Sequence, residues 1–307
     1  ALRIQDLMVL RIINDNNWNR PIYFGVTVSP TSMLNLDNYL QMEGLAYRLV
    51  NNSNQIINQN KMSDNLLSYI GDNSWFTDYD SNKYNLLDRD ISKEYQRGYI
   101  FRNLANEKVY VDPQLGRLVQ NYRTGFVRLS ISHYLNKDFQ KAEAALLKME
   151  EIMPSSIIPI PSKQLQYQIA QVYSGVGNQA KMKYHMKELV ERKDLLLEDY
   201  ILYGKTFIQL LEDYDESKLI FETIYQNYKL IEQSILRRGF TATKISEKEW
   251  QDWQQSLPEI IYLLFLSYKN LEMYDEAKIL LNDWINKNPA DDNAKELLEE
   301  ILQLESS

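Results

Sequence analysis

Histidine and cysteine, the usual nucleophiles, general bases and soft metal ligands, are scarce in this chain, which has two histidines and no cysteine. His133 and His185 both fall in stretches with a helical period, and a single histidine on a helix more often packs against its neighbours than catalyses a reaction. Asp78 and Asp80 have the right chemistry for a hard cation, but the further ligands of a calcium loop are missing around them. We therefore expect no metal site and no bound cofactor.

Glycines and carboxylates offer no stronger candidate for chemistry. Gly175 and Gly177 lie at a turn between helical stretches rather than after a strand, so they do not form a phosphate-binding loop. No G-x-S-x-G elbow occurs either. Three carboxylate pairs lie in surroundings that favour a solvated surface: Asp88/Asp90, Glu150/Glu151 and Glu299/Glu300. We therefore expect no catalytic residue in this chain.

The acidic balance argues against another class of function. The 307 residues carry 34 Lys and Arg against 42 Asp and Glu, a net charge of −8, whereas nucleic-acid binding requires a basic surface. The longest apolar run, residues 260–266, is far shorter than the ~20 residues of a membrane-spanning helix. The chain begins at Ala1 rather than at methionine, as an excerpt of a longer protein would, and the lack of cysteine suits a cytosol or a bacterial periplasm.

A helical pattern repeats along the chain, so helices must position any functional side chains. Four stretches carry a packing residue where two helices would touch: Ala142, Met182, Ser217 and Ala277. A turn residue precedes each by three positions: Phe139, Gln179, Tyr214 and Tyr274. This spacing is that of the tetratricopeptide repeat, a helix–turn–helix unit that buries its apolar face only against neighbouring copies. The uneven intervals between copies indicate degenerate repeats with insertions, the longest over residues 230–257.

The helical period and its punctuation predict the extent of each helix pair. We expect pairs over residues 115–152, 162–193 and 198–238, with Gly239 ending the third pair. Ser246 and Glu249 form a capping box for a further helix, and Pro258 begins the fourth pair. An amphipathic helix after Pro289 would cover the last apolar face.

Residues 1–113 read as a separate small region. We expect Asp6 to cap a short helix, a strand within residues 20–28, and a second strand over residues 45–50. The predicted fold is thus mainly α: a tetratricopeptide-like α-solenoid of about four degenerate repeats over residues 114–307, preceded by a small α/β cap over residues 1–113.

Such a solenoid has a concave wall that binds peptides or glycans through tyrosines and polar groups. The first helix of each pair would supply that wall, and the positions expected to face away from its partner helix are Tyr134, Tyr167, Gln171, Gln209, Tyr262 and Lys269. The alternative is an ordinary solvated surface.

The opening segment and a later one also resemble a known family. The matching stretches are residues 6–10, 17–24 (N-W-N-R-P-I-Y-F), 36–50 (L-D-N-Y-L-Q-M-E-G-L-A-Y-R-L-V), 109–112 and 121–126. They resemble the C-terminal tail of bacterial multi-span membrane glycosyltransferases that are related to the protein O-mannosyltransferases. Asn51 departs from the pattern, in which proline follows Val50.

The resemblance implies a parent enzyme whose catalytic acid lies outside this chain, so it transfers no catalytic residue. It singles out a set of tail-motif residues: Trp18, Arg20, Pro21, Tyr23, Tyr39, Glu43, Gly44, Tyr47, Arg48, Tyr122 and Arg123. Arg20 precedes a proline and is therefore extended. Arg48 and Arg123 could pair with Glu43 or with a lipid phosphate, and we favour a half-buried ion pair that stabilises the fold.

These observations lead to one main expectation. The chain is expected to be a non-catalytic, extracytoplasmic (periplasmic) tail of a membrane glycosyltransferase at a bacterial inner membrane. It would contact the membrane-embedded part of its parent and hold a protein partner or acceptor in the repeat groove. The alternative is a free-standing tetratricopeptide-repeat adaptor that binds protein partners. A soluble enzyme is the weakest of the three readings.

Overall fold

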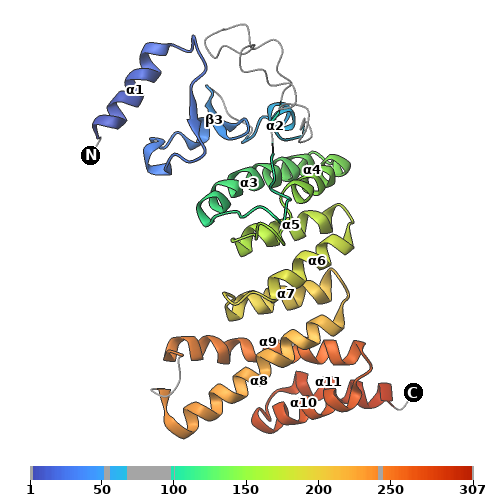
Figure 1. Cartoon of the computed structure of the whole chain (residues 1–307). Coiled ribbons are helices and arrows are strands. Elements are labelled where there is room, and N and C mark those ends of the chain that lie inside the picture. Colours follow the sequence, from blue (N-terminus) through green and yellow to red (C-terminus); the bar gives the residue numbers. More distant parts are fainter. Residues whose placement is uncertain (1–2, 52–55, 68–97, 100, 241–244, 306–307) are drawn as a thin grey trace. The chain divides into compact units, whose positions relative to one another are not determined.

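The computed structural model describes residues 3–51, 56–67, 98–99, 101–240 and 245–305. The acidic positions Asp78, Asp80, Asp88 and Asp90 lie outside the described residues. The contacts divide the chain into two compact units, unit 1 (Ala1–Asn178) and unit 2 (Gln179–Ser307). The described residues form eleven α-helices and one small sheet, so the chain is mainly helical, as predicted (Figure 1).

Unit 1 begins with a helix and a three-stranded antiparallel sheet. The strands are ordered β1-β3-β2, and their bounds with those of the helix are α1 (Ile4–Asn16), β1 (Tyr23–Gly25), β2 (Leu40–Met42) and β3 (Ala46–Leu49). Two 3₁₀ turns, Pro30–Ser32 and Asp37–Tyr39, connect β1 to β2. Phe24, Met33, Leu40 and Leu49 form the core on one face of the sheet, where Val9 and Ile13 of α1 pack.

Two local predictions for this region were only partly right. The expected strand over residues 20–28 shortens to β1, because Val28 N–H donates to Gly25 O and turns the chain away. Strand β2 was not predicted. Asp6 is not the residue before the helix but lies in its first turn, where its carboxylate accepts from Arg3 N–H at 2.8 Å. It thereby satisfies a free amide at the helix start.

A short helix that follows the sheet contacts the first long helix of unit 1. Helix α2 (Gln59–Leu66) packs against α3 (Pro113–Leu135). Gln59 Nε2 donates to Ser132 Oγ at 2.8 Å. A Cβ at Gly125 would lie 3.4 Å from Leu66, an ordinary contact distance, so α2 packs directly on α3 at this position.

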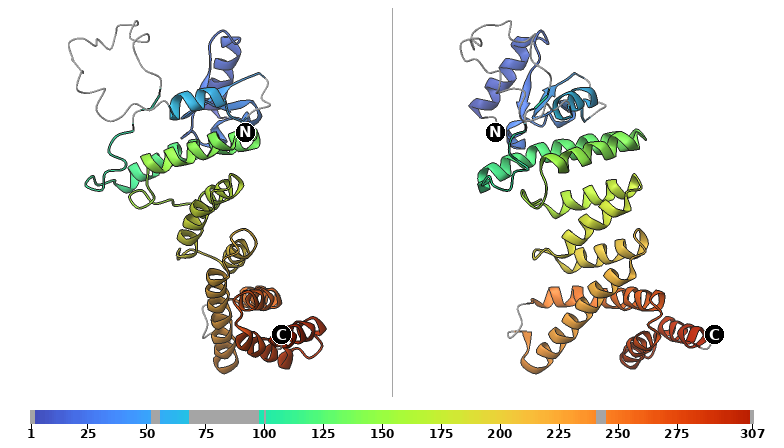
Figure 2. Two further views of the ribbon diagram at one scale, coloured as in Figure 1. Left: turned by 90° about the vertical axis from the view of Figure 1, so that its right-hand side faces the viewer. Right: turned by 45° about the vertical axis from the view of Figure 1, so that its right-hand side comes forward.

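The remaining helices follow the predicted pairs. In chain order they are α3, α4 (Phe139–Ile152), α5 (Lys163–Gly175), α6 (Gln179–Val190), α7 (Leu197–Gln209), α8 (Tyr214–Arg238), α9 (Glu247–Asn270), α10 (Tyr274–Lys287) and α11 (Asp292–Glu305). In unit 1, α3 packs on α4, and α5 packs on both. In unit 2, α8 packs on α7 and α9, and α10 packs on α9 and α11; these last helices are the orange and red ribbons of Figure 2.

The turn between the two helices of a pair recurs four times. A left-handed residue lies five positions before each packing residue: Lys137, Gly177, Glu212 and Glu272. In three of the turns the next amide donates 2.9 Å to a carbonyl five residues earlier, from Asp138 to His133, Asn178 to Tyr173 and Met273 to Tyr268. All four packing residues are fully buried. The same local geometry therefore repeats where the sequence pattern repeats.

The long insertion between the third and fourth pairs is helical. As predicted, α8 continues to Arg238 and Gly239 follows it with a positive φ, and Ser246 and Glu249 cap the next helix. Pro258 does not begin a helix; it lies inside α9, which runs unbroken from Glu247. Pro258 is exposed, and Leu257 and Ile260 are buried beside it. Burial of that apolar face on both sides of the proline offsets the hydrogen bond that the proline cannot make.

Candidate functional site

The tail-motif residue Glu43 is the centre of a half-buried polar cluster. It lies just after β2, and only 5% of its side chain is exposed. Tyr23 Oη donates to its Oε2 at 2.9 Å, and Asn58 Nδ2 donates to its Oε1 at 3.0 Å. The Arg48 guanidinium lies 3.6 Å from Oε1. The expected ion pair of Arg48 with Glu43 is thus present, with Arg48 half exposed.

The register of the sheet explains why these groups meet. Tyr23 and Arg48 are directly opposite each other in the β1–β3 pair, so their side chains share one face of the sheet. Burial, followed by the hydrogen bond to Glu43, raises the pKa of Tyr23. Asn58 completes the cluster from the start of α2, and nothing local in the sequence indicates that role.

Gly44 allows the tight turn that places Glu43. Its φ is +96°, and a Cβ there would lie 2.1 Å from Tyr99 Oη. That hydroxyl accepts from Leu45 N–H at 2.8 Å, while Asn65 Nδ2 donates to Glu43 O at 3.1 Å. Only glycine fits both the backbone angle and the space.

Arg123 does not pair with Glu43. Its side chain is 1% exposed, and its guanidinium donates to three backbone carbonyls of the segment between α4 and α5. The distances are 2.9 Å to Met153 O, 2.7 Å to Ile158 O and 3.2 Å to Pro159 O. The expected pairing with Glu43 or a lipid phosphate is therefore wrong for this residue. A proline-containing connector leaves carbonyls unpaired, and Arg123 satisfies them.

Two further motif tyrosines pack between elements of unit 1. Tyr47 Oη accepts from Arg128 of α3 at 3.1 Å. The ring of Tyr122 meets Tyr99 and Phe101 edge-on, with centroids 5.4 and 5.3 Å apart. These contacts tie the sheet region to α3.

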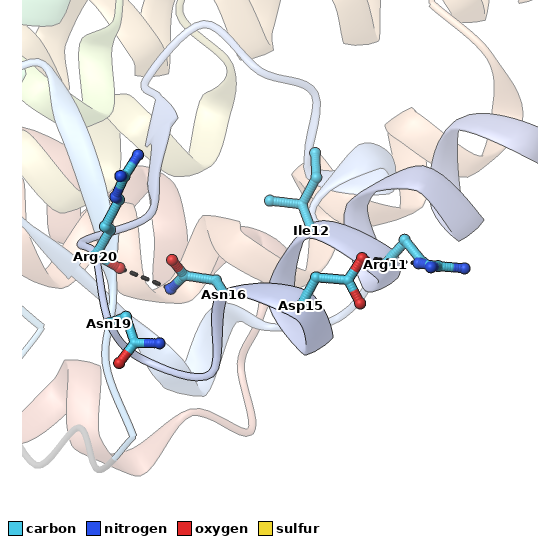
Figure 3. Close-up of a pocket in the computed structure, with 6 residues that line it drawn as sticks. All are labelled: Arg11, Ile12, Asp15, Asn16, Asn19 and Arg20. Carbon is cyan, nitrogen blue, oxygen red and sulfur yellow. Dashed lines mark hydrogen bonds and ion pairs between the residues drawn. The ribbon is translucent and has the colours of Figure 1, made fainter.

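The other motif residues lie on the surface. Trp18 is 56% exposed and Tyr39 is 48% exposed; Pro21 is exposed as well. Arg20 is exposed, and no partner is described for its guanidinium among the residues that the structure places. It lines an open pocket of about 430 Å³ together with Arg11, Asp15, Asn16 and Asn19 (Figure 3). The motif thus separates into residues that hold the fold and residues that face outward.

The expected groove residues of unit 1 differ in their surroundings. The Tyr134 ring packs beneath α5, where a side chain at Gly175 would come within 2.5 Å of it. Tyr167 is half-buried, and Gln171 on the same helix is exposed. Tyr134 therefore contributes to packing between helices of unit 1.

The three expected groove residues of unit 2, Gln209, Tyr262 and Lys269, lie on one surface. Gln209 of α7 and Tyr262 of α9 are exposed. Lys205 of α7 pairs with Glu259 of α9, and these two helices pack together. Residues three, four or seven apart share a helix face, so we define the α7–α9 face by Leu202, Lys205, Gln209, Glu259, Tyr262 and Lys269. Lys269 pairs with Glu300 and extends this face to α11. The ion pairs across it were not predicted.

The two histidines are buried in helices α3 and α6. Burial lowers the pKa of His133, so the ring is neutral near pH 7. Within the described ranges, no group of three His, Asp or Glu side chains could hold a metal ion.

Comparison with known proteins assigns a relationship to the beginning of the chain. Residues 1–66 match the family model described as TMEM260-associated domain 2, a domain associated with a membrane protein. This segment contains α1, the sheet and α2. No curated protein and no solved structure matches the chain. Among the described helices, none has the length and apolar composition that crossing a bilayer requires.

Proposed function

We propose that this chain is a non-catalytic, extracytoplasmic part of a bacterial membrane glycosyltransferase related to the protein O-mannosyltransferases. Its role is to contact the membrane-embedded part of the enzyme and to position a protein acceptor or partner. The match of residues 1–66 with a membrane-protein-associated domain carries this proposal. The tail-motif residues that resemble the family lie mostly within the same segment.

The helical pairs supply the binding role. We infer that they stack as a tetratricopeptide-like solenoid, because the same left-handed turn recurs at the same distance from each packing residue. The α7–α9 face is the partner surface in unit 2. It combines an exposed tyrosine, an exposed glutamine and paired charges, which suits a peptide with both apolar and polar groups.

A deletion in the native gene tests the proposal. Removing residues 114–307 should abolish or strongly reduce glycosylation of acceptor proteins, measured by lectin blot and mass spectrometry at matched enzyme abundance. A Tyr262→Ala/Gln209→Ala variant should reduce it while leaving the fold intact, since both side chains are exposed. Unchanged glycosylation in the deletion strain would contradict the proposal.

The second candidate is a free-standing adaptor. It is favoured by the fact that residues 67–307, with all of the helical pairs, lie outside the family match. The upstream reading frame separates the two candidates: hydrophobic spans continuous with Ala1 support the enzyme tail, whereas a start codon or signal sequence directly before it supports the adaptor.

A further inference from the structure

Unit 2 has an open pocket of about 340 Å³ that is lined by residues of α6, α7 and α8. Helix α7 packs against both of the other helices. Lys187, Val190 and Glu191 line the pocket from the end of α6, and because residues three or four apart share a helix face, they form one strip. The lining residues of α8 are spaced in the same way. The pocket shares no residue with the α7–α9 face.

Aliphatic side chains supply the apolar part of the pocket. Ile220 is buried and Val190 is half-buried, whereas Leu219 is 60% exposed. Leu219 therefore offers apolar surface that a ligand can cover, beside side chains that are already packed. Tyr200 at the start of α7 is half-buried, and no partner is described for its hydroxyl among the residues that the structure places. The pocket thus combines aliphatic surface with a hydroxyl that is available to a ligand.

The cation that lines the pocket is paired, whereas one of the two anions is not. Lys187 of α6 forms an ion pair with Glu216 of α8, and Lys183 forms a second such pair with Asp213. Glu191 is exposed just after the last residue of α6, and its carboxylate has no described partner in the placed part of the chain. The C-terminal end of a helix carries a partial negative charge. The carboxylate and the helix end together therefore favour a cation.

The overall charge of unit 2 favours a ligand of the same sign. Residues 179–307 carry 16 Lys and Arg against 25 Asp and Glu, a net charge of −9, whereas residues 1–178 carry 18 against 17, a net charge of +1. Charges of one sign raise the local concentration of ligands of the opposite sign. Unit 2 therefore attracts basic ligands and repels acidic ones.

We propose that this pocket binds a basic peptide segment of a partner protein, in which a lysine or arginine neighbours a branched aliphatic residue. The cationic group pairs with Glu191, and the aliphatic side chain covers Leu219. An acidic peptide lacks the charge that the pocket attracts, and a polyamine has no branched aliphatic group to cover Leu219. The inference goes beyond the proposed function, because it adds a second binding surface with a stated ligand chemistry and does not depend on sugar transfer.

Fluorescence anisotropy with the whole chain and short labelled peptides tests the proposal. One probe has a central Leu-Lys-Ile-Arg sequence flanked by glycine and serine. A second probe has glutamate in place of the two basic residues, and a third has serine in place of the two aliphatic ones. The first peptide should bind, with an affinity that falls as salt screens the exposed charges. The other two should bind about tenfold or more weakly.

Two substitutions test the assigned contacts. Glu191→Gln should weaken binding of the first peptide about threefold, because an exposed ion pair contributes little to affinity. Glu191→Gln/Leu219→Gln should weaken it about tenfold or more, because the aliphatic contact is then lost as well. Each variant must keep the helical circular dichroism and the melting temperature of the unaltered chain.

Matched controls separate the pocket from the general charge and stickiness of unit 2. Glu299 of α11 is exposed and Leu302 is 49% exposed, so Glu299→Gln/Leu302→Gln makes the same change of charge and removes a comparable leucine. This variant should bind the first peptide as the unaltered chain does. Tyr262→Ala/Gln209→Ala on the α7–α9 face should also leave binding unchanged, because neither residue lines the pocket.

Four results would overturn the proposal. The first is an unaltered chain that does not bind the basic aliphatic peptide, and the second is equal binding of the acidic or the serine peptide. The third is full binding by the Glu191→Gln/Leu219→Gln variant. The fourth is an equal loss of binding in either control, which would place the peptide elsewhere on unit 2. Peptide binding is measured without any sugar transfer, so this proposal and the glycosylation phenotype of the 114–307 deletion fail separately.

Discussion

At the scale of single residues, Arg123 shows how a charged side chain can hold a backbone segment. Its guanidinium replaces water for three carbonyls of a connector that contains Pro154, Pro159 and Pro161. Arg123→Ala should lower the free energy of unfolding by about 3 kcal/mol or more, because those carbonyls would stay buried without donors. Arg123→Lys should recover only part of this, since one ammonium cannot span the planar fork of contacts.

Urea denaturation followed by circular dichroism measures this change. Arg20→Ala is the matched control, because Arg20 is exposed, and its effect should stay within about 0.5 kcal/mol. Equal stabilities for the Arg123 and Arg20 variants would show that the carbonyl contacts contribute nothing.

Gly44 and Gly177 allow two causes of glycine preference to be separated. Both have a positive φ, at +96° and +85°, but only Gly44 faces a close neighbour. Gly177→Ala should cost about 1 kcal/mol from backbone strain alone, whereas Gly44→Ala should cost about 3 kcal/mol or more because its Cβ would also clash with Tyr99. Thermal unfolding of the two variants gives the comparison, and a smaller effect at Gly44 than at Gly177 would contradict the steric account.

At the scale of elements, tyrosines join neighbouring helices. Tyr173 of α5 donates to Glu150 of α4 at 2.8 Å, and Tyr268 of α9 donates to Glu222 of α8 at 2.8 Å. Tyr228 of α8 stacks on Trp250 of α9 at 4.9 Å between centroids. The pKa of Tyr173 and of Tyr268 is raised above its usual value, first by burial and then by the nearby carboxylate.

These shifts predict loss of stability in alkali. Burial and then Glu232 raise the pKa of Tyr228 to about 12, above the value near 10 of a free tyrosine. Above pH 10 the folded state therefore binds more protons than the unfolded state, so the stability present below pH 10 falls as pH rises towards 12. A pH titration that records phenolate absorbance and helical circular dichroism should show both changing together, and Tyr228→Phe should make the loss shallower. Full ionisation of all tyrosines near pH 10 with unchanged helicity would contradict this.

Helices were predictable from the sequence where their signals are local. The apolar period, the glycine turns and the Ser246 capping box each act within a few residues, and the extent of the first helix pair and the end of α8 at Arg238 follow from them. The prediction that Pro258 begins a helix was wrong, because the burial of Leu257 and Ile260 outweighs the local helix-breaking effect of the proline. Long-range pairings could not be predicted.

The cluster around Glu43 shows why. Arg48 is five residues from Glu43, and a half-buried ion pair between them was expected. Asn58 reaches the same carboxylate only because α2 follows the sheet at that point, and Arg123 faces carbonyls more than 29 residues away rather than Glu43. Such partners depend on the tertiary arrangement, and no local sequence pattern predicts them.

At the scale of the whole molecule, the division into two units determines how cooperatively the chain is expected to unfold. Unit 1 contains a core around Phe126 and Leu129, and unit 2 contains one around Phe221 and Phe265, all fully buried. Chains with more than one compact unit often unfold in more than one step. We therefore expect differential scanning calorimetry to resolve two transitions.

Substitutions in each unit assign those transitions. Phe221 of α8 presses against Gly204 of α7, where a Cβ would lie 2.5 Å from its ring. Phe221→Ala should therefore lower one transition by about 10 °C, given a cost of about 3–5 kcal/mol for removing a buried phenylalanine, and leave the other in place. Arg123→Ala should do the reverse, lowering the transition of unit 1 alone. A single transition that both substitutions lower equally would mean that the 307 residues unfold as one cooperative body. In that case, a partner bound at the α7–α9 face would stabilise the sheet region as much as the helices that form the face.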